Sequence, residues 1–249
     1  MQYFYLWLLF VISAPSLAAQ NTLPENFALL PDDVQSLILE YAFFNEEVSQ
    51  HWGDQASYAS EKAYVKYLDD YLSRAKIDFD AGLLTVETLA SSEPLKQLKA
   101  AIVTALLTPD DPNAVDIYSA QEIDIKGKPF LHGRVLDQSG KAIRYAWRAE
   151  KFAQYMIDQH LKVSDTLDGQ RYGVKIKWVK NHKKVAASGV KAWVSQASDR
   201  FDLPESLILG IIETESGFNS FAVRLSLIVV KLRISANNTV NSLLSPSKV

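Results

Sequence analysis

Two acidic residues, Glu213 and Glu215, lie near the end of an apolar stretch with helical character. At 100° per residue, Ile208, Ile211 and Ile212 would lie within about 60° of Glu215, whereas Glu213 would point almost opposite. We therefore expect Glu213 in water and Glu215 on the face that packs against the protein. A buried carboxyl group stays protonated more readily and can act as a general acid on a glycosidic oxygen. The alternative interpretation is that Glu215 lies at the rim of the apolar face and reaches water at the helix end.

The helix that carries these acids has a well-signalled start. Asp202 stands at an N-cap position, Glu205 completes a capping box three residues later, and Pro204 is tolerated in the first turn. Another helix is predicted over residues 190–198, and no strand pattern follows residue 181. The sequence therefore predicts a helical domain over residues 186–223.

The preceding part of the chain, residues 30–181, mixes helices with antiparallel strands. Apolar residues at helical spacing predict helices over 32–48, 58–75, 94–107 and 149–161. Alternating residues around short turns predict hairpins over 77–88 and 130–147, and a half-buried strand over 172–179. No βαβ rhythm appears, so the predicted fold class is α+β.

Composition limits the functions that this chain can have. The chain has 249 residues, of which 48% are hydrophobic and 22% charged, as in a globular protein of one or two domains. The net charge of −3 gives no general attraction for nucleic acid. The absence of Cys excludes disulfides, thiol nucleophiles and lipid attachment at a cysteine. The sequence shows no cluster of metal ligands or nucleotide motif, so we expect no metal and no cofactor, and we expect a monomer.

The first 19 residues have the pattern of an export signal. An apolar run is followed by small residues, with cleavage expected after Ala18 or Ala19. The alternative is a retained membrane anchor, since no Lys or Arg precedes the apolar run, although the run is shorter than the ~20 residues that a span needs. Export is the favoured interpretation.

The segment from Pro204 to Asn219, followed by Phe221-Ala222-Val223, resembles the opening of the goose-type-lysozyme-like lytic transglycosylase domain. In that family the Glu of a Glu-Ser pair is the catalytic acid, so the resemblance assigns this role to Glu215. It also implies that Ser216 helps to hold the substrate, although a Ser at a helix end is more often a capping or solvated residue.

The upstream region resembles the N-terminal domain of the membrane-bound lytic murein transglycosylase C family, and the likeness runs from about residue 51 to residue 223. The segments that carry it are His51-Trp52-Gly53, Tyr64-Val65-Lys66-Tyr67, Ile77-Asp78-Phe79-Asp80, Val86-Glu87-Thr88-Leu89-Ala90, Asp110-Asp111-Pro112 and Val115-Asp116-Ile117-Tyr118-Ser119. The resemblance implies a periplasmic lyase that acts on peptidoglycan glycan strands and associates peripherally with the envelope, at the outer membrane. Lipid anchoring is not supported, because Gln20 stands where that family has a lipid-modified Cys.

The implied reaction cuts the β-1,4 bond between N-acetylmuramic acid and N-acetylglucosamine without water. One Glu protonates the leaving oxygen and then, as a carboxylate, takes the proton of the muramyl C6 hydroxyl, which closes a 1,6-anhydro ring. This mechanism requires neither a metal nor a nucleotide.

The last residues, 224–249, depart from the family pattern. They contain no acidic residue, aromatic residue or Gly, and the Gly-Leu-Met-Gln and Ala-Tyr-Asn-Gly-Gly motifs of the family are missing. We expect a frameshift or truncation that leaves a shortened transglycosylase domain and impairs activity, because an unburied carboxyl group is ionised at neutral pH. The alternative for the tail is a β-rich segment that packs on the helices. The alternative function is that of a non-catalytic peptidoglycan- or envelope-binding protein.

Overall fold

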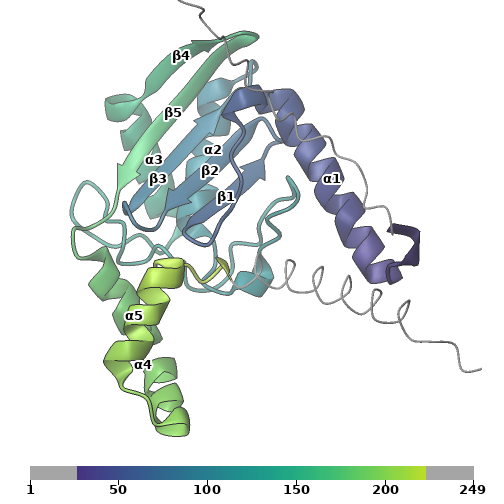
Figure 1. Cartoon of the computed structure of the whole chain (residues 1–249). Coiled ribbons are helices and arrows are strands. Elements are labelled where there is room, and N and C mark those ends of the chain that lie inside the picture. Colours follow the sequence, from purple (N-terminus) through teal and green to yellow (C-terminus); the bar gives the residue numbers. More distant parts are fainter. Residues whose placement is uncertain (1–26, 223–249) are drawn as a thin grey trace, which may run out of the picture.

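The structure is a computed structural model that describes residues 27–222 (Figure 1). The predicted export signal and the tail over 224–249 lie outside the described residues. The helices are α1 (Asp32–Trp52), α2 (Pro94–Leu107), α3 (Ala146–His160), α4 (His182–Phe201) and α5 (Glu205–Ser216), with short 3-10 helices η1 (Phe27–Leu29), η2 (Gly53–Gln55) and η3 (Pro112–Ala114). The strands are β1 (Ala63–Leu68), β2 (Ser73–Asp78), β3 (Leu83–Thr88), β4 (Lys162–Thr166) and β5 (Gly169–Lys177). The predicted α+β class is confirmed.

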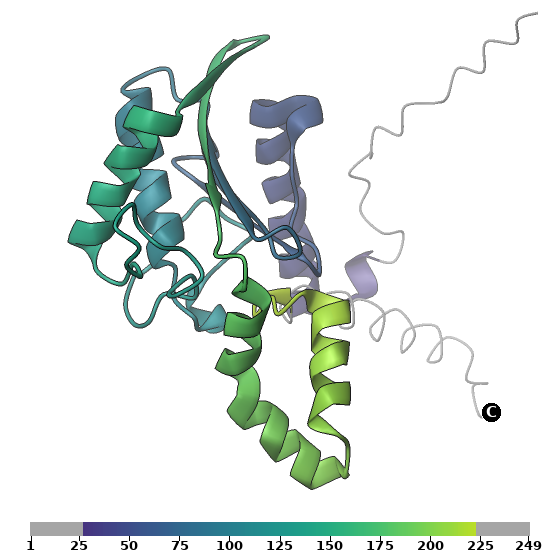
Figure 2. The same ribbon diagram turned by 90° about the vertical axis from the view of Figure 1, so that its left-hand side faces the viewer.

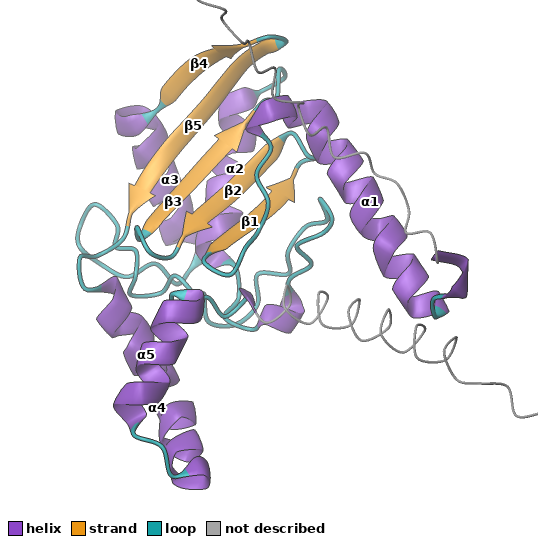
Figure 3. Ribbon diagram, in the orientation of Figure 1, coloured by secondary structure: helices purple, strands orange, loops and turns teal. Residues whose placement is uncertain are grey.

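The five strands form one antiparallel sheet in the order β1-β2-β3-β5-β4 (Figure 3). The predicted hairpin over 77–88 is the β2–β3 pair, with Ile77 opposite Leu84. The predicted strand over 172–179 corresponds to β5. Strand β4 was not predicted, because it is polar and mostly exposed and therefore lacks an alternating apolar pattern.

The sheet has an apolar core on each side, and the two cores differ in size. Helices α2 and α3 lie together on one face and form the larger core with strand residues such as Leu84, Val86 and Ile176 (Figure 2). On the opposite face α1 covers only the β1 side, where Phe44 and Trp52 join a smaller aromatic cluster. Most of that face therefore has no helix over it (Figures 1 and 2).

The helix predicted over 58–75 is wrong, because this region forms β1 and the start of β2. Tyr64 and Leu68 face the larger core, whereas Val65 and Tyr67 face α1. A strand that is buried on both faces has no alternating pattern, so its apolar run resembles the face of a helix.

The second predicted hairpin, over 130–147, is also wrong. Between its two predicted arms a single isolated bridge forms, from Leu136 to Ala142, and α3 begins at Ala146. The turn between them is closed by Asp137, whose carboxylate accepts hydrogen bonds from the Ser139 N–H (2.9 Å), the Ser139 hydroxyl (2.7 Å) and the Lys141 N–H (2.9 Å). A turn stabilised by one side chain does not need flanking strands.

Helices α4 and α5 form a hairpin that projects away from the sheet (Figures 1 and 2). The predicted helix over 190–198 lies within the longer α4. The predicted capping box is wrong: Asp202 has φ 51° and ends α4, with its N–H donating to the Ser198 carbonyl, and α5 starts after Pro204 with no side-chain cap. At the other end of α4, the His182 ring lies against the β2–β3 turn, where a Cβ on Gly82 would be only 2.7 Å from it.

Candidate functional site

Glu215 lies next to the last residue of α5, and its side chain is exposed. No residue of α5 is buried, and Ile211, on the predicted inward face, is 52% exposed. In the part of the chain that the structure describes, the prediction that Glu215 lies on a buried face is therefore wrong. The alternative interpretation, in which Glu215 reaches water at the helix end, agrees with its exposure. The physical reason is that α5 packs mainly against one helix, α4, which cannot cover its other sides.

Glu213 has the more enclosed position of the two acids. Its carboxylate accepts a hydrogen bond from Lys183 of α4 at 3.0 Å, and its side chain is 46% exposed. Lys183 also lies 3.8 Å from Asp80 in the β2–β3 turn. The hydrogen bond to Glu213 raises the pKa of the Lys183 ammonium group. Glu213, predicted to be a solvated surface acid, is about half exposed and also links α5 to α4.

The end of α5 is fixed against the turn between β2 and β3. The Ser216 hydroxyl donates to the Ile212 carbonyl at 3.0 Å, and the Gly217 N–H donates to the Glu213 carbonyl at 3.0 Å. Gly217 has φ 58°, and a Cβ there would lie 3.2 Å from the Cβ of Phe79. Only Gly combines this backbone conformation with this close approach without strain.

The residues just after Glu215 are anchored in the α+β part of the chain. The Asn219 amide donates to the carbonyls of Ser60 (3.4 Å) and Glu61 (3.0 Å). The Phe221 ring packs against Tyr64, with centroids 4.7 Å apart, and against Phe130, at 5.1 Å. Sequence reasoning missed this anchoring role, and the only signal for it was the presence of an amide and an aromatic residue in the motif.

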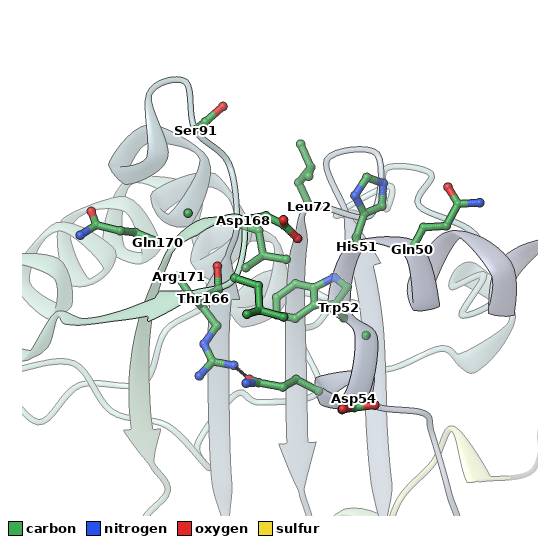
Figure 4. A pocket seen from close by; sticks show the side chains of 15 residues that line it. Gln50, His51, Trp52, Asp54, Leu72, Ser91, Thr166, Asp168, Gln170 and Arg171 are labelled. Carbon is green, nitrogen blue, oxygen red and sulfur yellow. Dashed lines mark hydrogen bonds between the residues drawn. The ribbon is translucent and has the colours of Figure 1, made fainter. Parts of the chain in front are cut away.

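A pocket of about 440 Å³ with mixed polar and apolar walls lies elsewhere, where the C-terminal end of α1 and η2 face the turn between β4 and β5. Figure 4 shows His51 and Trp52 on one side and Thr166, Asp168 and Arg171 on the other. Nothing in the sequence pattern pointed to this pocket, because its two walls are more than 100 residues apart in the chain.

Charged groups on the sheet contact residues that line this pocket. Glu87 accepts two hydrogen bonds from Arg74, at 2.7 and 2.9 Å, and lies 3.4 Å from Arg171. Arg171 also donates to the side chain of Gln55. The Arg74 guanidinium stacks 3.9 Å from the centre of the Trp52 ring. The Trp52 ring is therefore covered, and the groups open to a ligand include polar side chains from the two walls and the exposed Leu167.

Neither Glu215 nor Ser216 lines this pocket. Within residues 27–222 no group of three or more His, Cys, Asp and Glu side chains is arranged to hold a metal ion. A search of the same residues finds no helix with the length and apolar character of a membrane span.

Comparison with known proteins defines the class of the chain. Residues 31–188 match the family model of the N-terminal domain of membrane-bound lytic murein transglycosylase C. The match covers more than half of the chain, so the chain belongs to this family.

Individual relatives carry the same name. The membrane-bound lytic murein transglycosylase C of Cronobacter sakazakii is 44% identical over 184 residues, which cover 72% of this chain and 51% of that protein. The protein of that name in Klebsiella pneumoniae is 42% identical over 182 residues, with the same coverage. The one in Sodalis glossinidius is 39% identical over 218 residues, covering 86% of this chain and 61% of that protein. The chain thus spans about half the length of the first two relatives and somewhat more of the third.

Proposed function

We propose that the chain is a peptidoglycan lytic transglycosylase of impaired activity, which cleaves the β-1,4 bond between N-acetylmuramic acid and N-acetylglucosamine and forms a 1,6-anhydro ring. The observation that carries this proposal is the family match over residues 31–188. The substrate follows from the word murein in the name of that family. The partners are peptidoglycan glycan strands, the expected location is the periplasm at the outer membrane, and the expected state is a monomer.

Glu215 is the proposed catalytic acid. In this role its carboxyl group would protonate the leaving oxygen and then, as a carboxylate, accept the C6 hydroxyl proton. Its exposure at the end of α5 leaves it open to a glycan but without the burial that favours a protonated carboxyl group, so we expect impaired activity. Ser216 is the proposed substrate-binding neighbour. Its hydroxyl hydrogen is used by the Ile212 carbonyl, so its oxygen remains available to accept a hydrogen bond from a sugar hydroxyl.

The test uses the full chain and purified sacculi, with 1,6-anhydromuropeptides measured by mass spectrometry. We expect slow release by the unaltered chain, loss of release in Glu215→Gln, and little change in Glu213→Gln, which alters the neighbouring acid on the same helix. Absence of anhydro products at every protein concentration would overturn the proposal for this chain.

A second candidate function is peptidoglycan binding without cleavage. It is favoured by the pocket of about 440 Å³, whose walls combine polar and apolar groups, as sugar-containing ligands require, and which lies apart from Glu215. Co-sedimentation of Glu215→Gln with sacculi tests this candidate, since binding alone should not depend on that carboxyl group. Failure of both the unaltered chain and the variant to sediment would remove it.

A further inference from the structure

One face of the sheet is open and carries a concentration of basic side chains. Helices α2 and α3 cover the opposite face, and α1 covers only the β1 side of this one (Figures 1 and 2). Six basic side chains belong to the open face by strand alternation and register: Arg74, Lys76, Lys162, Arg171, Lys175 and Lys177.

The register places three of these lysines close together. Thr85 of β3 pairs with Lys76 of β2 on one side and with Lys175 of β5 on the other. Lys177 lies two residues beyond Lys175 on the same face. At ~4.8 Å between strands and ~3.4 Å per residue, the three Cα atoms lie within roughly 12 Å of one another. We call Lys76, Lys175 and Lys177 the lysine triad.

The triad has no acidic partner among residues 27–222. Two acidic residues share the open face, and Glu87 is already paired with Arg74 and Arg171. The other, Asp78, accepts a hydrogen bond from the N–H of Ala81 in the β2–β3 turn and forms no ion pair with a described residue. The open face is therefore positive, although the chain carries a net charge of −3.

Protection of a sheet edge does not explain this arrangement. Lysines often block an exposed edge strand, and the C-terminal half of β5 lies beyond the end of the β4 pairing. That role suits Lys175 and Lys177. It does not suit Lys76, which lies on β2 between two paired strands. Like charges held this close repel one another, and an anionic partner relieves that repulsion.

We propose that the open sheet face binds the carboxylates of the peptide stems of peptidoglycan through the lysine triad. This proposal rests on the proposed function, because it names a part of the same polymer. Charge complementarity selects the occupant: an extended stem presents separated carboxylates to a flat face, and each ammonium group donates to one of them. The face is a binding surface and takes no part in the proton transfers assigned to Glu215.

The test compares two full-length variants of equal charge in a sedimentation assay with native sacculi. Lys76→Gln/Lys175→Gln/Lys177→Gln removes the triad. Lys128→Gln/Lys151→Gln/Lys191→Gln removes three exposed lysines outside the open face and is the matched control. A second arm uses sacculi whose carboxylates have been converted to neutral amides with a carbodiimide and ethanolamine.

We expect the triad variant to bind native sacculi about tenfold more weakly than the unaltered chain, as for three exposed ion pairs. The control variant should bind like the unaltered chain. The unaltered chain should bind neutralised sacculi about tenfold more weakly than native ones.

Equal binding of both variants to native sacculi, or no effect of neutralisation, would overturn the inference and leave the proposed function standing. No sedimentation of the unaltered chain on either kind of sacculus, with anhydro products still released, would also overturn the inference. Absence of both sedimentation and products would overturn the proposed function as well.

Discussion

The α+β part and the α4–α5 hairpin are built in different ways. The sheet and its helices enclose a core in which residues such as Ile77, Leu84 and Ile102 are fully buried. In the hairpin, only Ala186 and Val194 of α4 are buried and no residue of α5 is, while Trp193 is 70% exposed. This difference indicates that the α+β part positions the Glu-Ser motif, through its contacts with Asn219 and Phe221. A core within the described hairpin does not do so.

The largest loss of stability is expected when Phe221, which anchors the end of the hairpin to the α+β part, is truncated. Phe221 is 1% exposed and packs between Tyr64 and Phe130, so Phe221→Ala should lower the free energy of unfolding by about 3–5 kcal/mol. Urea denaturation measures this change.

The matched control is Phe201→Ala, at the end of α4, where the ring is 61% exposed. This variant should change the free energy of unfolding by less than about 0.5 kcal/mol. Equal effects of the two substitutions would show that the hairpin contributes its own core, contrary to the comparison.

A second substitution affects the α+β part alone. Asp137→Asn should lower the free energy of unfolding by about 2 kcal/mol at pH 7, because it weakens the bonds to Ser139, Lys141 and Arg148. Asp168→Asn, at an exposed turn residue, is the control and should have little effect.

The pH dependence of this effect has a definite sign. Removal from water alone would raise the pKa of Asp137, but the hydrogen bonds from Ser139, Lys141 and Arg148 outweigh it and lower the pKa well below its usual range. A carboxyl group with a lowered pKa stabilises the fold above its unfolded pKa of ~3.9 and loses that contribution as the pH falls toward the folded value. The difference between the unaltered chain and Asp137→Asn should therefore shrink below about pH 4. A difference that grows on acidification would contradict the assignment.

A smaller effect is expected where the hairpin meets the sheet. Gly217→Ala should lower the free energy of unfolding by about 1 kcal/mol, because φ is 58° and the new methyl group would crowd Phe79. Hydrogen exchange should also become faster in the last turn of α5 and stay unchanged in α2. Gly210→Ala is the control: a Cβ there meets no atom within 4 Å, so this variant should be neutral or slightly stabilising.

The smallest expected effect concerns the ion pair within the hairpin. Lys183→Met should lower the free energy of unfolding by less than any of the substitutions above apart from the controls, since the pair with Glu213 is about half exposed. The effect should decrease when the salt concentration is raised from about 0.05 to about 0.5 M, because exposed charges are screened. An effect as large as that of Gly217→Ala and insensitive to salt would mean that this contact is a main support of the hairpin.

The sequence predicted those elements whose pattern is local. The helices over 94–107 and 149–161 and the hairpin over 77–88 are confirmed, since each has a regular period or a short turn. The region 58–75 was misassigned because its burial depends on α1 and on the larger core, which lie elsewhere in the chain.

The candidate site shows the same limit. The spacing of apolar residues predicts the helix that contains Glu215. It does not predict that Glu215 is exposed, because an apolar stripe on α5 does not indicate whether another element covers that stripe. The roles of Asn219 and Phe221 depend on Ser60, Glu61 and Tyr64, more than 150 residues earlier. Contacts of this kind leave no local pattern in a single sequence.

The close approach of Gly82 to His182 limits which sequences this fold accepts. Gly82 has φ 59°, and any added side chain would meet the His182 ring within 2.7–3.1 Å. In a library of all single substitutions, position 82 should be among the least tolerant, while Gly140, with φ 75° and nothing within 4 Å, should accept Asn or Asp more often. A ring larger than that of His182 at position 182 should also be poorly tolerated, because it would clash with the backbone at Gly82. Substitutions at these two positions should therefore depend on each other.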